Sequence, residues 1–191
     1  MANMRKIFAK KLEGFSLIEV SMVLLIVGII AGAMLKGKDL IDAAQIKSVA
    51  SDIQNLQIAY ANYVNSYGSI PGDDNLAKSR FGDVENGDGD GKISSDDAKK
   101  IFSHLYAAGF IESKNFKTPK IGGTYEVISD ENSFKLKISN NGNPFITGKQ
   151  LISLKAKVAE LIGDNKGNIE SDPTDVSLDT SKKYIVKIKI D

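Results

Sequence analysis

One stretch of the sequence, residues 15–35, contains a single charged side chain, Glu19, among apolar and small residues. A helix needs about 20 predominantly apolar residues to cross the hydrocarbon core of a bilayer, so this run is just long enough. Basic residues flank it on both sides: Arg5, Lys6, Lys10 and Lys11 precede it, and Lys36 and Lys38 follow. Because basic flanks favour the cytoplasmic side, their excess before the run predicts a single-pass segment with a cytoplasmic N-terminus.

Glu19 decides between three interpretations of this segment. A plain membrane anchor and a secretory signal peptide cleaved after Ala33 both leave the carboxylate unexplained. A carboxylate inside an apolar helix costs roughly 3 kcal/mol on insertion scales and usually has a partner. The apolar stretch of a signal peptide is also shorter, about 7–15 residues. We therefore favour a helix in which Glu19 has a partner.

Residues 11–20, KLEGFSLIEV, resemble the processing site of the type IV pilin family, which includes the pseudopilins of type II secretion. In that family a membrane peptidase cuts after the glycine and N-methylates the new first residue. The resemblance implies cleavage between Gly14 and Phe15, methylation of Phe15, and Glu19 as the fifth residue of the mature chain. It also implies three partners: a prepilin peptidase, an inner-membrane assembly platform, and copies of this chain with other pilins in a helical filament.

The role of Glu19 in such a filament follows from electrostatics, guided by the family. Cleavage gives Phe15 a new α-ammonium group, and in a stack of parallel helices the Glu19 carboxylate of one subunit can pair with the ammonium group of its neighbour. Two charges that are each costly alone become tolerable together, and their pairing sets the axial register. We expect Glu19→Ala to leave cleavage intact and to abolish filaments.

The helical pattern continues beyond the apolar run. Apolar and aromatic residues recur at spacings of three and four: Ile46, Val49, Ile53, Leu56, Tyr60, Tyr63 and Tyr67. No proline falls between residues 15 and 67, and Gly68 offers a stop. The pattern predicts one helix over 15–67, roughly 80 Å long at 1.5 Å per residue. We expect the tyrosines to pack on a core rather than stack on bases, since no basic residues interleave them.

Residues 86–97, NGDGDGKISSDD, align with the 12-residue calcium loop of an EF-hand. That loop binds the cation through positions 1, 3, 5, 7 (a carbonyl), 9 and 12, with glycine at position 6. The corresponding residues are Asn86, Asp88, Asp90, Lys92, Ser94 and Asp97, with Gly91 at the turn. The loop therefore predicts a structural Ca²⁺ site.

Two departures from the EF-hand pattern weaken the predicted calcium site. Position 1 is Asn86 rather than Asp, and position 12 is Asp97 rather than the longer bidentate Glu. Four further acids are candidates to complete the ligand set: Asp73, Asp74, Asp83 and Glu85. Residues 95–106 predict a helix leaving the loop, but Pro71 and several glycines precede it, so no helix enters. Many pilins close the C-terminal region with a disulfide, which a chain without cysteine lacks, and calcium can supply that restraint instead.

The C-terminal third predicts the remaining elements of a small α+β domain. Residues 124–128 and 133–138 alternate polar and apolar as a hairpin, residues 184–190 form a third strand, and 147–162 an amphipathic helix. The turn at 163–168 is a weaker candidate for a second cation site. The sequence as a whole therefore predicts three parts: a cleaved leader (1–14), a long helix (15–67, with 15–35 for membrane and assembly) and a periplasmic or extracellular domain (68–191). The expected architecture is lollipop-shaped, with the long helix packed on a small antiparallel sheet.

Several function classes find no support in the sequence. Lys and Arg total 25 against 24 for Asp and Glu, so no overall basic footprint indicates nucleic acid. The absence of cysteine excludes thiolate metal sites and cysteine nucleophiles. His104, the only histidine, lies at helical spacing from apolar residues and is expected to be structural, and no phosphate-binding or nucleophile motif is present. We therefore expect a structural filament subunit, either of a pilus or of a type II secretion pseudopilus, and not an enzyme. The alternative from another class is a secreted calcium-binding module with a signal peptide cleaved after Ala33.

Overall fold

The computed structural model describes residues 14–114, 116, 119–130, 133–163, 169–172 and 182–190. It divides into two units, 1–40 and 41–191, each described by itself. Residues 1–13 of the predicted leader and 164–168 of the predicted second cation turn lie outside the described residues.

Helix α1 covers Leu17–Tyr67, close to the predicted 15–67. In the first unit its apolar side chains are all exposed. In the second unit it buries one face, composed of Ile46, Val49, Ala50, Ile53, Leu56, Ala59 and Tyr63. The spacing of three and four puts these residues on one side of the helix, as predicted. Tyr60 and Tyr67 pack at the edge of this face, with Tyr60 5.1 Å from the ring of Phe134.

The sheet of the second unit is antiparallel throughout. Strands β1 (Thr124–Asp130) and β2 (Ser133–Ser139) form the predicted hairpin, and β2 pairs with β5 (Lys183–Lys189). Two short strands on the other side of β5 were not predicted: β3 (Ile146–Thr147) and β4 (Ile169–Asp172). Strand alternation turns Phe134, Leu136, Ile138, Tyr184, Val186 and Ile188 inward, where they are fully buried.

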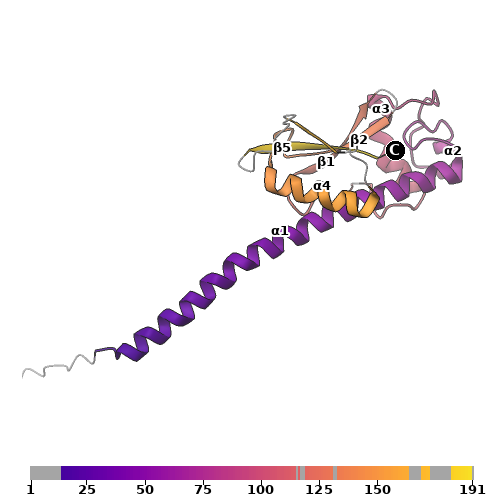
Figure 1. The fold of residues 1–191 in the computed structure, drawn as a ribbon. Coiled ribbons are helices and arrows are strands. Elements are labelled where there is room, and N and C mark those ends of the chain that lie inside the picture. The colour runs from indigo at the N-terminus through magenta and orange to yellow at the C-terminus, as the bar shows by residue number, and fades with distance from the viewer. Residues whose placement is uncertain are drawn as a thin grey trace, which may run out of the picture. The chain divides into compact units, whose positions relative to one another are not determined.

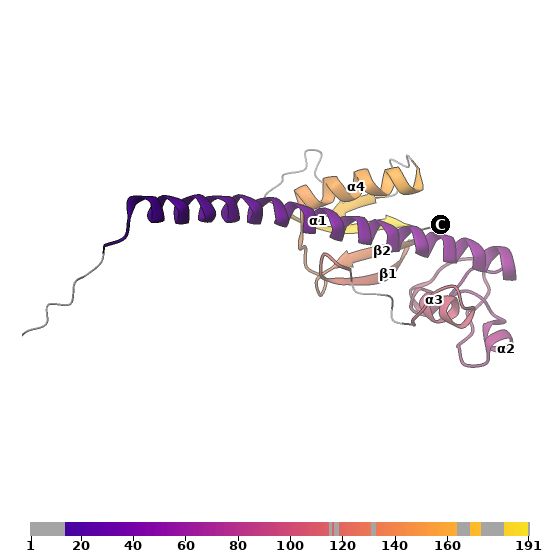
Figure 2. The same ribbon diagram turned by 90° about the horizontal axis from the view of Figure 1, so that it is seen from below.

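Helix α4 (Gly148–Ile162) and the second half of α1 lie side by side on one face of this sheet (Figure 1, Figure 2). Thr147 and Gln150 form a capping box that starts α4, and the side chain of Gln54 on α1 donates to the carbonyl of Leu161 at its end, 3.1 Å away. Each end of α4 therefore has a side-chain partner for one of its free backbone groups. The core lies between the two helices and the inward face of the sheet.

A loop region with two further helices, α2 (Ala77–Phe81) and α3 (Ser95–Ala107), lies at the end of α1 that carries Tyr67 (Figure 2). Helix α3 matches the predicted 95–106, while α2 was not predicted. Ile101 and Leu105 of α3 join the core. The residues between α2 and α3, which include most of the predicted calcium loop, therefore lie in the same region as the C-terminal end of α1.

Candidate functional site

The predicted processing site lies just before the first helical residue. Gly14, Phe15 and Ser16 have no regular secondary structure, and the Phe15 side chain is 87% exposed. Glu19 accepts a hydrogen bond from the backbone N–H of Ser16, 2.8 Å away, and the Ser16 hydroxyl accepts from the N–H of Ile18 at 3.3 Å. Ser16 and Glu19 therefore cap the start of α1 reciprocally, a role that the spacing Ser-x-x-Glu could have predicted.

The first half of α1 is an exposed apolar rod. Its large apolar side chains range in exposure from 45% for Val20 to 90% for Leu17. By length and composition it is able to cross a membrane. Soluble monomers rarely expose contiguous apolar surface of this extent, so this segment requires lipid or other protein around it.

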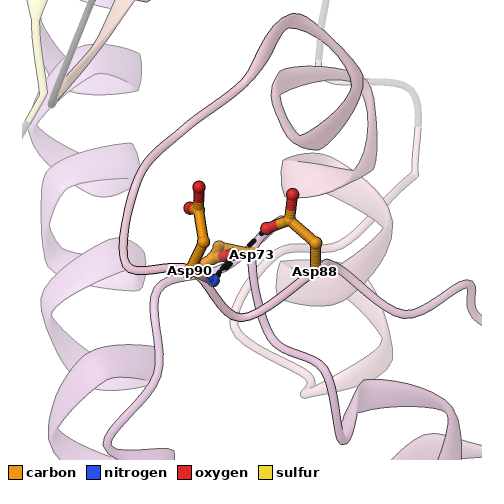
Figure 3. A group of neighbouring side chains, drawn as sticks. All are labelled: Asp73, Asp88 and Asp90. Atoms are coloured by element: carbon orange, nitrogen blue, oxygen red, sulfur yellow. Dashed lines mark hydrogen bonds between the residues drawn. The ribbon is translucent and has the colours of Figure 1, made fainter.

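Three carboxylates meet in the loop region: Asp73, Asp88 and Asp90 each offer an oxygen within 4.8 Å of the others (Figure 3). Asp88 and Asp90 are the predicted ligands at positions 3 and 5 of the calcium loop. Asp73 was a candidate to complete the site, and it comes from the turn before α2, 15 residues earlier than Asp88. Oxygen atoms in such a group suit a hard cation such as Ca²⁺.

Asp73 also organises the loop through hydrogen bonds. Its Oδ1 accepts from the N–H groups of Gly89 and Asp90 at 2.7 and 3.1 Å, and its Oδ2 accepts from Gly91 at 2.9 Å. Burial raises the pKa of the Asp73 carboxyl, the neighbouring Asp88 carboxyl raises it further, and the three N–H donors oppose both effects.

The other predicted ligands make different contacts. Asn86 Oδ1 accepts from the N–H of Lys78 at 2.8 Å, at the start of α2. Ser94 and Asp97 form the capping box of α3, with Asp97 Oδ2 accepting from the Ser94 N–H at 3.0 Å. The backbone N–H of Lys92 donates to Asp90 Oδ1 at 2.8 Å. The structure therefore brings two of the six predicted ligands together with Asp73. It places Asn86 on the backbone N–H of Lys78, and Ser94 and Asp97 in the capping box of α3.

Asp74, Asp83 and Glu85 lie outside the carboxylate group. Asp74 is buried and accepts hydrogen bonds from the Tyr63 hydroxyl at 2.7 Å and from the Arg80 guanidinium. Asp83 pairs with Lys114 at 3.6 Å. Burial, and then the Asp74 carboxylate, raise the pKa of the Tyr63 phenol far above its ordinary value. Sequence reasoning did not find this network of Tyr63, Asp74 and Arg80, because its members come from separate segments.

His104 is fully buried and bridges two backbone groups of the loop region. Its Nδ1 accepts from the N–H of Gly72 at 2.9 Å, so Nε2 carries the proton and donates to the carbonyl of Glu85 at 2.8 Å. Burial lowers the pKa of the imidazole. Both ring nitrogens are thus occupied in holding the loop, a structural role.

Neither the family models nor the curated proteins include a match to the sequence. Among solved structures, the chain is similar to the major type IV pilin PilA1 from Clostridium difficile, with 24% identity and a TM-score of 0.43. The similarity covers 78% of this chain and 96% of that chain.

Proposed function

We propose that this chain is a prepilin, a structural subunit of a type IV pilus-like filament that is cleaved between Gly14 and Phe15. The observation that carries the proposal is Glu19, a single carboxylate near the start of an exposed apolar helix and four residues beyond Phe15 of the Gly14–Phe15 junction. A prepilin peptidase would expose the amino group of Phe15, and an inner-membrane platform would transfer the subunit from lipid into the filament.

The exposed apolar half of α1 supports both stages of this proposal. Before assembly it needs a bilayer, with the N-terminus in the cytoplasm and the second unit on the opposite side. After assembly the same surface needs the corresponding helices of other copies. Filament formation then replaces lipid contacts by helix packing, and the Glu19 carboxylate obtains a cationic partner.

The mature N-terminus tests the proposed processing. Intact-mass and peptide mass spectrometry of the chain isolated from its own cells should identify a methylated Phe15 at the N-terminus. A chain beginning at Met34 would instead support the secreted module cleaved after Ala33. An N-terminus at Met1 would refute processing altogether.

The contact between Glu19 and Ser16 suggests a sharper test than alanine alone. Glutamine can cap a helix start as glutamate does but carries no charge. We therefore expect Glu19→Gln to retain the cap and cleavage but to lose filaments, as Glu19→Ala does. Normal filaments from Glu19→Gln would show that capping, and not charge pairing, is the role of Glu19.

A pseudopilin of a type II secretion system is the alternative within the same family. Such a subunit would share the processing site and the exposed helix, and its short filament would push cargo out of the periplasm. Neighbouring genes for a secretion platform, or loss of protein secretion on deletion of this gene, would favour it over a surface fibre.

We also propose that the loop region binds a structural Ca²⁺ ion through Asp73, Asp88 and Asp90. The convergence of three carboxylates supports the proposal, since such a group repels itself without a cation. Chelation should lower the melting temperature of the full chain in detergent, and calcium should restore it. Asp88→Asn should abolish the difference; a melting temperature that chelation leaves unchanged in the native chain would refute the site.

A further inference from the structure

A groove runs along the second half of α1 in the 41–191 unit. It has a volume of about 420 Å³ and lies between α1 residues 52–62 and the described residues 110–113 and 116 that follow α3. Its apolar lining includes Ile58, which is 52% exposed, and the half-buried Phe110 and Ile111. The groove therefore combines apolar surface with an open side.

The charged side chains described in the groove lining are acidic. They are Asp52 and Glu112. Asp52 accepts a hydrogen bond from the hydroxyl of Tyr125 at 3.1 Å, which fixes the carboxylate beside the groove. An occupant that matches this lining would present apolar side chains and a cation.

The first half of α1 carries a surface with these properties. Residues Ile29, Ala33, Lys36 and Leu40 follow one another at spacings of four, three and four, so they share one face of the helix. All four are exposed, with Ile29 at 64% and Leu40 at 72%. Lys36 is the charged member of this set. An amphipathic helix that enters an apolar groove uses anchors at this spacing.

We propose that this groove receives the helix face of Ile29, Ala33, Lys36 and Leu40 from a second copy of the chain. The inference rests on the proposed filament and names the surfaces through which two of its subunits meet. Lys36 of one copy lies between Asp52 and Glu112 of the other, and the two parallel helices are displaced along their axes by about 20 residues, roughly 30 Å.

Engineered cysteines test this contact in a chain that has none of its own. Ala33→Cys combined with Asn55→Cys places one thiol on the proposed face and one in the groove. These positions are 22 residues apart in α1, about 33 Å within one copy, so a disulfide between them must join two copies. Leu35→Cys with Asn55→Cys is the matched control, because residue 35 points about 200° around the helix from residue 33.

In cells that process and assemble the full chain, mild oxidation should convert the first pair into covalent multimers and leave the control monomeric. Filaments that form without cross-linking of the first pair, or with equal cross-linking of the control, would overturn the groove assignment and leave the proposed function standing. Absence of filaments and of any multimer from the unaltered chain would overturn both.

Charge reversal provides an independent readout. Lys36→Glu places a carboxylate against Asp52 and Glu112 and should reduce the yield of assembled filament about tenfold or more. Adding Glu112→Lys to that variant should restore most of the yield. Unchanged filament yield in Lys36→Glu, or a double variant no better than the single one, would refute the pairing.

Discussion

Tyr63→Phe removes a single buried hydroxyl and tests how the loop region is held against α1. The hydroxyl donates to Asp74 Oδ2 at 2.7 Å, and Asp74 also accepts from Arg80 and, through Oδ1, from the N–H of Leu76 at 2.9 Å. A hydrogen bond to a charged group contributes about 1.5–3 kcal/mol. Because Asp74 keeps two of its three donors, we expect a loss of about 2 kcal/mol in the free energy of unfolding.

The corresponding shift in melting temperature follows from the size of the unit. Residues 41–191 unfold with an entropy of about 2.1 cal/mol/K per residue, or about 0.3 kcal/mol/K in total, so 2 kcal/mol lowers the melting temperature by about 6 °C. All six tyrosines lie in this unit, at residue 60 or later. Near-ultraviolet circular dichroism of the full chain in detergent therefore reports its unfolding without interference from the apolar half of α1.

Tyr67→Phe is the matched control for this experiment. The Tyr67 ring packs 4.8 Å from that of Tyr63 and contacts Phe81, but its hydroxyl makes no hydrogen bond among the described residues. Its removal should change the free energy of unfolding by at most about 0.5 kcal/mol and the melting temperature by no more than about 2 °C. Equal shifts for the two variants would show that the Tyr63–Asp74 bond contributes nothing measurable.

Two further predictions concern the same region. His104 is buried as the neutral imidazole with a lowered pKa, so the stability it contributes is complete above about pH 6.5 and is lost as the pH falls below that value. Urea unfolding should therefore give a lower free energy of unfolding at pH 5 than at pH 7. His104→Gln should make this difference between the two pH values smaller. Gly87→Ala would place a Cβ 2.1 Å from the carbonyl carbon of Asp73 and should lower the free energy of unfolding by about 3 kcal/mol. Gly91→Ala adds its Cβ in open space at a φ of +80° and should lower it by about 1 kcal/mol. Thermal unfolding of the two variants compares these losses.

Periodicity predicted the elements that bury a long face. The helices α1, α3 and α4 and the strands β1, β2 and β5 begin and end within about two residues of their predicted limits. The three elements it did not predict, α2, β3 and β4, have five, two and four residues. Segments that short span at most about one and a half helical turns or two strand alternations, too few for a periodic pattern to stand out. Their conformation depends on pairing with β5 or on contacts in the loop region.

The proposed processing site depends on local sequence alone, and it stays a prediction. Gly14, Phe15 and Glu19 lie within six residues, and their spacing carries the resemblance without any tertiary information. Asp73 could be named only as one of four nearby acids, since its approach to Asp88 depends on how the chain turns between them. The backbone bonds of Gly87 to Asp74 and of Gly89 to Asp73, both 2.9 Å, produce that approach.

Ser94 and Asp97 show why spacing alone does not assign a ligand set. Positions 9 and 12 of a calcium loop are three positions apart, and so are the two residues of a helix capping box, the N-cap and N3. Both functions use the same oxygens, and in the structure the caps of α3 occupy them. A cation at Asp73, Asp88 and Asp90 does not compete with these bonds. We therefore expect metal removal to loosen the backbone around Gly89 and Gly91, measured as faster amide hydrogen exchange, while the N–H groups of Asp96 and Asp97 remain protected; equal loss of protection at α3 would place the cation at the capping residues instead.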